Sequence, residues 1–176
     1  EGALALPQVN ASRLVDVDVD VTSVADLNEP AHTKATVVLP DAGTLPPTPI
    51  VCFGFPGGGY SRRYYTFDMP GSQDGGQAGW HAARGWIFVA CDHLGVGESS
   101  LPDRNRLVYK NVSAANHETV QEILRRLADG SLLQGYPSIR NPVVLGIGQS
   151  MGGCLTVVQQ ARHGTYDGIG VLGWSS

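Results

Sequence analysis

The chain has 176 residues, of which 42% are hydrophobic and 16% are charged, and its formal net charge at pH 7 is −4. Such a composition is typical of one globular domain with a substantial core, and it excludes an intrinsically disordered chain. The acidic balance argues against a nucleic-acid partner, because phosphate binding needs a concentrated basic surface. No apolar run reaches the roughly 18 residues that cross a bilayer, so we expect a soluble protein, cytoplasmic or secreted, without a membrane partner.

Two strands are predicted near the N-terminus. Residues 14–21 alternate between apolar residues and aspartates, which is the pattern of a strand with one face in water. Residues 33–39 predict a second strand, and the proline-rich segment 40–49 leads out of it. Both strands fit an antiparallel edge of a larger sheet.

A third predicted strand runs into a glycine-rich loop. Residues 50–55 (Ile-Val-Cys-Phe-Gly-Phe) are almost all apolar, and residues 56–60 (Pro-Gly-Gly-Gly-Tyr) follow directly. Three consecutive glycines leave backbone N–H groups unshielded, and such donors can converge on a developing oxyanion; a merely flexible loop is the alternative. The cluster 62–65 (Arg-Arg-Tyr-Tyr) is interpreted as a solvated rim in preference to a contact with an anionic or aromatic part of a substrate.

The middle of the chain alternates between predicted helices and strands. Residues 77–84 predict a helix of small residues, and residues 86–91 predict a buried strand that ends in a glycine-punctuated turn at 92–99. Apolar residues between positions 120 and 127 mark one face of a further helix, which ends at Gly130.

A serine lies between two glycines where a predicted strand, 142–147, gives way to a predicted helix, 153–163. The segment 148–152 (Gly-Gln-Ser-Met-Gly) has the G-x-S-x-G pattern of a nucleophile elbow, and an ordinary glycine-rich turn is the alternative. In an elbow the sharp turn forces Ser150 into a sparsely populated backbone conformation, and the glycines let strand and helix approach closely. Residues 168–174 predict one more strand.

The order of these elements predicts an α/β fold with a mostly parallel sheet and helices on both faces. Strands that alternate with helices, and that are apolar on both sides, are typical of such sheets. The three cysteines, Cys52, Cys91 and Cys154, fall within apolar patterns and have no metal-ligand spacing, so we expect free buried thiols and no metal.

Four motifs, in this order and spacing, resemble the α/β-hydrolase family. They are the glycine loop 56–59, with proline where the family's loop has histidine; the passage 84–99 from helix through strand to the Asp-x-x-Gly-x-Gly-x-Ser turn; the elbow 148–152; and Tyr-Asp-Gly at 166–168 before the last strand. The resemblance covers nearly everything from about residue 14 onward. It implies the N-terminal part of the family's fold and a serine hydrolase of the esterase kind.

The resemblance also implies roles for particular residues. Ser150 would be the nucleophile, the N–H of Met151 one oxyanion donor, and Gly58 or Gly59 the second donor. Ser150 would attack a carboxylic ester, lactone, thioester or amide and form an acyl-enzyme, which water would release. No metal or organic cofactor is implied.

Two other kinds of function stay open. An acyltransferase or a carbon–carbon hydrolase would use the same nucleophile and differ in what else reaches the site. A ligand-binding protein that keeps the fold without the chemistry is the non-enzymatic alternative, because a fold does not fix a function.

The acid and the histidine of a triad are not apparent. In this family they follow strands beyond the one that ends near Trp174, so we expect residues 1–176 to form the N-terminal portion of one domain. A second chain from the same precursor, separated by cleavage near Ser176, would complete the sheet in a heterodimer and bring both residues. Within this chain only His93 follows the carboxyl end of a parallel strand, which makes it the secondary candidate for the base. The remaining histidines are expected on the surface or in packing: His32, His81, His117 and His163.

Overall fold

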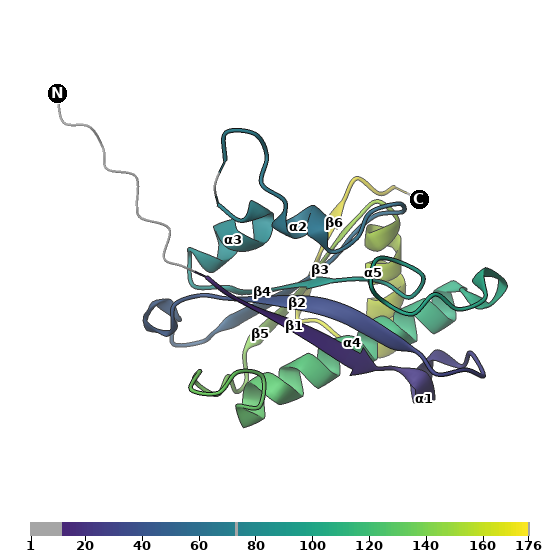
Figure 1. The fold of residues 1–176 in the computed structure, drawn as a ribbon, viewed down its shortest axis with the longest axis horizontal. Coiled ribbons are helices and arrows are strands. Elements are labelled where there is room, and N and C mark those ends of the chain that lie inside the picture. Colours follow the sequence, from purple (N-terminus) through teal and green to yellow (C-terminus); the bar gives the residue numbers. More distant parts are fainter. Residues whose placement is uncertain (1–11, 73, 176) are drawn as a thin grey trace.

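The computed structural model describes residues 12–72 and 74–175. It contains a six-stranded sheet in the order β1-β2-β4-β3-β5-β6, with helices on both faces (Figure 1). The strands are β1 (Arg13–Asp20), β2 (His32–Leu39), β3 (Ile50–Phe55), β4 (Ile87–Cys91), β5 (Val143–Gln149) and β6 (Gly168–Leu172). The helices are α1 (Thr22–Ala25), α2 (Arg63–Thr66), α3 (Gly76–Ala82), α4 (Tyr109–Asp129) and α5 (Met151–His163), with short 3-10 turns at Ala42–Thr44 and Arg104–Arg106.

The N-terminal strands form the predicted antiparallel edge. β1 pairs with β2, and β2 pairs with β4, both in the antiparallel sense. Along β1, Val17 and Val19 are buried while the aspartates between them are exposed, because successive side chains of a strand point to opposite faces.

The other strands run parallel, as their apolar composition predicts. β4 pairs with β3, β3 with β5, and β5 with β6, all in the parallel sense. All five residues of β4 are buried, as are the last five of β3. Because these carboxyl ends lie at one edge of the sheet, the loops that follow β3, β4 and β5 meet there.

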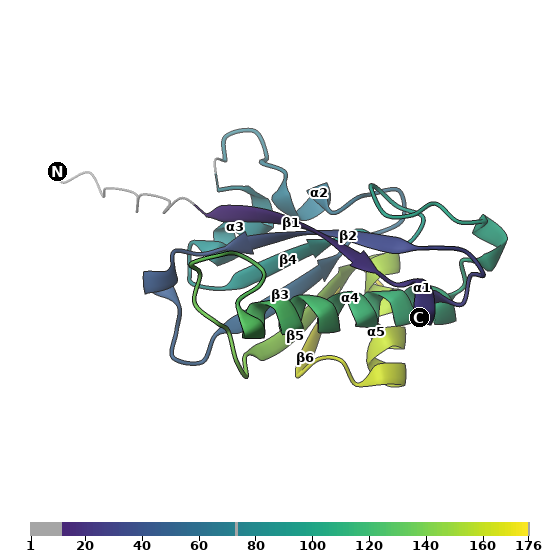
Figure 2. The same cartoon turned by 60° about the horizontal axis from the view of Figure 1, so that its bottom comes forward.

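Helices cover the two faces unequally (Figures 1 and 2). The long helix α4 and the helix α5 lie on one face, where Val120, Ile123 and Leu127 of α4 join the larger apolar core. The shorter α2 and α3 lie on the other face, where Tyr65 and Ala78 pack with Phe88 in a smaller core.

Helix α4 begins eleven residues before the apolar face that marked it in the sequence, at Tyr109 rather than near Val120. Its first half buries polar side chains: Asn111, Ser113, Asn116 and Thr119. Buried polar groups of this kind need hydrogen-bond partners, and the Asn111 amide donates to the Ala25 carbonyl oxygen at 2.6 Å. An apolar pattern cannot reveal a helix face that is buried through polar contacts.

The three cysteines are free thiols, as predicted, but not all of them are buried. Cys52 and Cys91 are buried within β3 and β4, and burial raises the pKa of Cys52 to about 12. The prediction was wrong for Cys154, which is half-buried on α5.

The last strand leaves one edge of the described sheet open. In the described ranges β6 pairs with β5 alone, and several apolar side chains on and after it are exposed: Ile169, Val171, Leu172 and Trp174. The predicted cleavage point near Ser176 lies outside the described residues. No helix in the described part of the chain is long and apolar enough to cross a membrane.

Candidate active site

Ser150 occupies a strained turn between β5 and α5. Its backbone angles are φ 54° and ψ −120°, a conformation that a residue with a side chain rarely adopts and that costs on the order of 1–3 kcal/mol. The turn is fixed by its surroundings, since the Ser150 N–H donates to the Leu172 carbonyl oxygen at 2.7 Å and its own carbonyl accepts from the Gly153 N–H at 2.8 Å. The predicted backbone strain at Ser150 is therefore present.

The two flanking glycines have no room for a side chain. A Cβ atom on Gly148 would lie 2.1 Å from the Gly152 carbonyl oxygen. One on Gly152 would lie 2.2 Å from the carbonyl oxygen of Phe55, at the end of β3. Strand and helix thus approach one another closely because both positions lack a side chain.

The glycine loop after β3 passes directly over the elbow. A Cβ atom on Gly57 would be 3.1 Å from the Ser150 Cβ, and the Gly57 N–H donates to the Gln149 side-chain oxygen at 3.0 Å. That N–H is already engaged. Gly58 comes next to Met151, where a Cβ atom would contact the thioether sulfur at 3.7 Å.

These positions place two backbone segments near the Ser150 side chain. Met151 is the first residue of α5, so its N–H has no partner within the helix and lies at the positive end of the helix dipole. Gly58 lies beside Met151, whereas Gly59 has a left-handed φ of 83° and is exposed, with open space beside it. Of the two glycines predicted as donors, Gly58 is therefore the one nearer to the elbow.

Only half of the cluster 62–65 is the solvated rim that the sequence predicted. Arg63 and Tyr64 are exposed, but Tyr65 is fully buried and Arg62 is only 7% exposed. The Tyr65 hydroxyl donates to the Phe55 carbonyl oxygen at 2.9 Å. The prediction failed for Arg62 and Tyr65 because their partners lie at or after the ends of strands β3 and β4, where sequence spacing does not show them.

Arg62 is held by the carboxylate of Asp92, which follows β4 and is 1% exposed. One Asp92 oxygen accepts the Arg62 backbone N–H at 2.6 Å, and the other accepts a guanidinium nitrogen at 2.7 Å. The guanidinium also pairs with Glu98. Charge-assisted bonds of this kind are stronger than neutral ones, and here they fix the end of the glycine loop to the end of β4.

His93 fixes the beginning of the same loop. Its Nε2 lies 2.9 Å from the Pro56 carbonyl oxygen, and its Nδ1 lies 3.0 Å from the Asn116 amide nitrogen. The Asn116 amide donates to Nδ1, so the ring proton is on Nε2 and is donated to Pro56. The ring also stacks on Phe55, with 5.3 Å between centroids. Burial lowers the pKa of His93, which keeps the imidazole neutral.

His93 is therefore wrong as a candidate base, because both of its ring nitrogens are engaged away from Ser150. In residues 12–72 and 74–175 no histidine is hydrogen-bonded to the Ser150 hydroxyl.

The other histidines lie in other contacts. His117 and His163 stack on one another between α4 and α5, with centroids 4.6 Å apart, and His81 stacks on Trp86. His32 begins β2 and contacts Ser100.

Sequence reasoning missed the roles of Arg62, Asp92 and Asn116 in shaping this region. One signal was available for Asp92: it follows β4 directly, and the glycine loop follows the neighbouring parallel strand β3. Side chains after adjacent parallel strands meet at the same edge of the sheet. Nothing in the sequence pattern pointed to Asn116, which lies in the polar half of α4.

No family model matches the sequence, and no curated protein sequence matches it. Solved structures do match its fold. A peroxisomal alpha-beta-hydrolase from Saccharomyces cerevisiae aligns with a TM-score of 0.63 and 12% identity, over 92% of this chain and 44% of that one. An esterase from Pyrococcus furiosus aligns with a TM-score of 0.60 and 14% identity, over 96% of this chain and 53% of that one.

A rice cell wall degrading esterase from Xanthomonas oryzae aligns with a TM-score of 0.57 and 18% identity, over 91% of this chain and 41% of that one. The chain thus spans about half the length of these structures, or less. At such low identity the matches show the fold alone. The chain has the α/β-hydrolase fold, as its four sequence motifs predicted.

Proposed function

We propose that this chain carries the nucleophile of a serine hydrolase that cleaves carboxylic esters, and that Ser150 is this nucleophile. The observation that carries the proposal is the backbone of Ser150, a non-glycine residue held at φ 54° between a parallel strand and a helix. Strain of this order persists only where the surrounding structure enforces it, and it gathers at functional sites. Two of the solved structures with this fold are named as esterases, which supports the choice of an ester as the substrate.

In the proposed mechanism the Ser150 hydroxyl loses its proton to a base and attacks the carbonyl carbon of the ester. The carbonyl oxygen then carries negative charge, which the N–H groups of Met151 and Gly58 stabilise. Collapse expels the alcohol, which takes up the proton held by the base, and leaves an acyl group on Ser150. A water molecule, deprotonated by the same base, releases the acid and restores the hydroxyl.

The base and its orienting acid come, in this proposal, from a polypeptide that pairs with β6. Two observations support it. The five histidines of the chain engage other groups or lie away from Ser150, and within the described residues β6 pairs with β5 alone and exposes apolar side chains such as Val171 and Leu172. An exposed strand edge of this kind is a template for pairing with another strand.

The test is covalent labelling of the natively purified protein with a small fluorophosphonate, followed by intact-mass measurement and peptide mapping. We expect one label, on Ser150, and a second polypeptide in the preparation. Ser150→Ala should abolish labelling, whereas Ser23→Ala, at an exposed serine of α1, should not change it. A folded protein with no label on Ser150 would contradict the proposal and leave a binding protein with this fold.

A further inference from the structure

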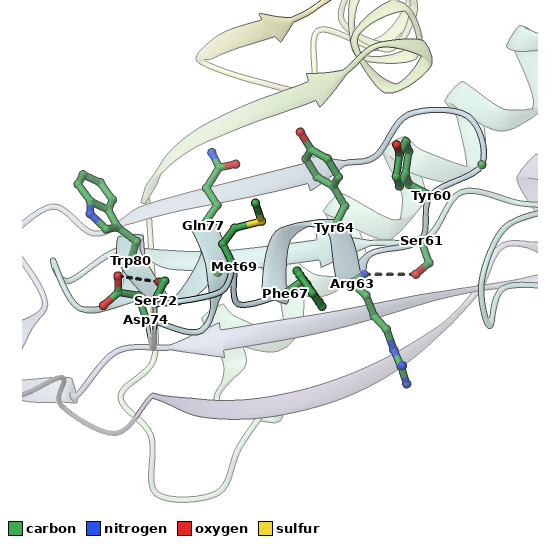
Figure 3. A pocket seen from close by; sticks show the side chains of 12 residues that line it. Tyr60, Ser61, Arg63, Tyr64, Phe67, Met69, Ser72, Asp74, Gln77 and Trp80 are labelled. Carbon is green, nitrogen blue, oxygen red and sulfur yellow. Dashed lines mark hydrogen bonds between the residues drawn. The ribbon is translucent and has the colours of Figure 1, made fainter.

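An aromatic pocket of about 730 Å³ opens beside the glycine loop (Figure 3). Its apolar lining comes from the loop itself, from α2, from the segment after α2 and from α3. The lining side chains used below are Tyr60, Tyr64, Phe67, Met69 and Trp80. The pocket is separate from the contacts that hold Ser150.

These five side chains are exposed to a degree that is unusual for large apolar groups. The exposed fractions are 55% for Tyr60, 40% for Tyr64, 63% for Phe67, 67% for Met69 and 45% for Trp80. Large apolar side chains that gather around one concave site mark a place where a ligand or partner binds.

The charged residues of the lining do not face its middle. The Arg63 side chain extends to the opposite side of the ribbon from the rings of Tyr60 and Tyr64 (Figure 3). Asp74 lies at the end near Trp80, where its carboxylate accepts a hydrogen bond from Ser72 at 3.2 Å. An uncharged apolar group therefore fits the middle of the pocket better than a carboxylate, since Arg63, the cationic side chain of the lining, points away from it.

The pocket wall is held in place by contacts to the core. Tyr60 meets Tyr64 edge-on at 5.6 Å between ring centroids, and Tyr64 meets the fully buried Tyr65 edge-on at 5.0 Å. On the far side, the Arg84 guanidinium lies 3.6 Å from the centre of the Trp80 ring. Rings that are already fixed lose little conformational entropy when a ligand binds.

The distance between Ser150 and the pocket determines how long a group of the substrate must be to reach the pocket. The pocket begins at Gly59 and Tyr60, and Gly57 lies against Ser150. Two residues of chain span at most about 7 Å. A chain of about six carbons is long enough to cover this distance, so a substrate whose carbonyl lies at Ser150 could extend over the glycine loop and place such a group in the pocket.

We propose that this aromatic pocket binds the uncharged apolar group of the substrate, an alkyl or aryl group of about six carbons or more, while its carbonyl lies at Ser150. This inference rests on the proposed function and adds the chemical class of the substrate to it. The pocket then acts as the part of the site that selects among esters.

The test compares the labelling rates of Ser150 by ethyl and octyl fluorophosphonates in the natively purified protein. Each buried methylene group contributes up to about fourfold in binding, so we expect octyl to react at least about tenfold faster than ethyl. Trp80→Ala and Phe67→Ser should each lower the octyl-to-ethyl ratio about threefold or more. Because Phe67 is exposed, its variant should fold normally. Tyr109→Ala, at an exposed ring on α4 outside the pocket, should keep the ratio.

Equal rates for the two compounds, with Ser150 labelled by both, would overturn the inference and leave the proposed function standing. An octyl preference that survives both pocket variants would also overturn it, because the apolar group would then bind elsewhere. No labelling of Ser150 by either compound would overturn the proposed function, and this inference with it.

Discussion

The imidazole of His93 donates from Nε2 to the carbonyl oxygen of Pro56 across 2.9 Å, and so joins the end of β4 to the first residue of the glycine loop. The ring is fully enclosed, and Asn116 bonds its other nitrogen. Its position at the end of a strand predicted a candidate base. Its contacts show a residue that positions the loop.

Replacing His93 by leucine should lower the free energy of unfolding by about 2–4 kcal/mol. The substitution leaves the Pro56 carbonyl and the Asn116 amide without their partner, and unsatisfied buried polar groups cost about 1–3 kcal/mol each. Urea unfolding monitored by fluorescence measures the difference. His163→Leu, at an exposed ring, should change stability by less than about 0.5 kcal/mol. Equal stability of the His93 variant and the parent would contradict this account.

Stability should also fall as the pH falls below 6.5, the ordinary pKa of histidine. Burial lowers the pKa of His93 in the folded protein, so the unfolded chain binds its proton first and unfolding is favoured between the two pKa values. This residue therefore stabilises the fold above pH 6.5, and the contribution is lost toward lower pH. The slope from one such group is up to about 1.4 kcal/mol per pH unit.

The pH experiment compares the parent with His93→Leu by urea unfolding between pH 5 and pH 7.5, a window of about one unit or more on each side of the ordinary value. Burial lowers the pKa of His81 and His117 as well, so part of the slope should remain in the variant. An unchanged slope would show that the folded and unfolded states bind the His93 proton equally, and it would contradict the lowered pKa.

Alanine at Gly152 should prevent folding or cost more than about 3 kcal/mol, because its Cβ would lie 2.2 Å from the Phe55 carbonyl oxygen. Gly58→Ala is the matched control. Its Cβ would meet only the flexible Met151 side chain, at an ordinary 3.7 Å. Yield of soluble protein and thermal unfolding distinguish the two variants, and a Gly152 variant as stable as the Gly58 variant would be inconsistent with the close approach of strand and helix.

Asp92→Asn should destabilise the protein by about 3 kcal/mol, because the buried Arg62 guanidinium loses the buried anion at 2.7 Å and keeps the exposed Glu98 as a partner. It should also slow labelling of Ser150, since the glycine loop loses its anchor at Arg62. The control is Asp18→Asn, which removes an exposed pair with Lys34 and should cost less than about 1 kcal/mol. Normal labelling together with lowered stability would show that the ion pair holds the fold without positioning the loop.

Much of the fold could be predicted from local patterns. The alternation along 14–21 identifies an edge strand, and the apolar runs such as 50–55 and 86–91 identify the parallel sheet, because burial on one or two faces determines which positions must be apolar. The backbone at Ser150 could be predicted for a related reason. Glycine is required where two backbone segments touch, and the glycines at 148 and 152 can be seen in the sequence.

The parts that failed depend on partners distant in the sequence. The sequence predicts a surface position for Arg62, because its partner Asp92 is distant in the sequence and reaches it only through the pairing of β3 with β4. The first half of α4 has a polar sequence that predicts exposure. In the structure one face of it is buried, because Asn111 bonds the Ala25 carbonyl oxygen and Asn116 bonds the His93 ring. Buried polar contacts leave no periodic trace, so composition and spacing cannot locate them.

Three adjacent glycines would ordinarily give a segment that samples many conformations within nanoseconds to microseconds. Here the segment is tied at Pro56 by His93, at Gly57 by Gln149 and at Arg62 by Asp92, so any remaining freedom is confined to the few residues between the last two ties. Most of the conformational entropy of this loop is thus lost when the chain folds, before any substrate binds. In the proposed hydrolase, the residues on both sides of Gly58 would thus be fixed before a substrate binds, and turnover would not have to wait for the whole loop to close.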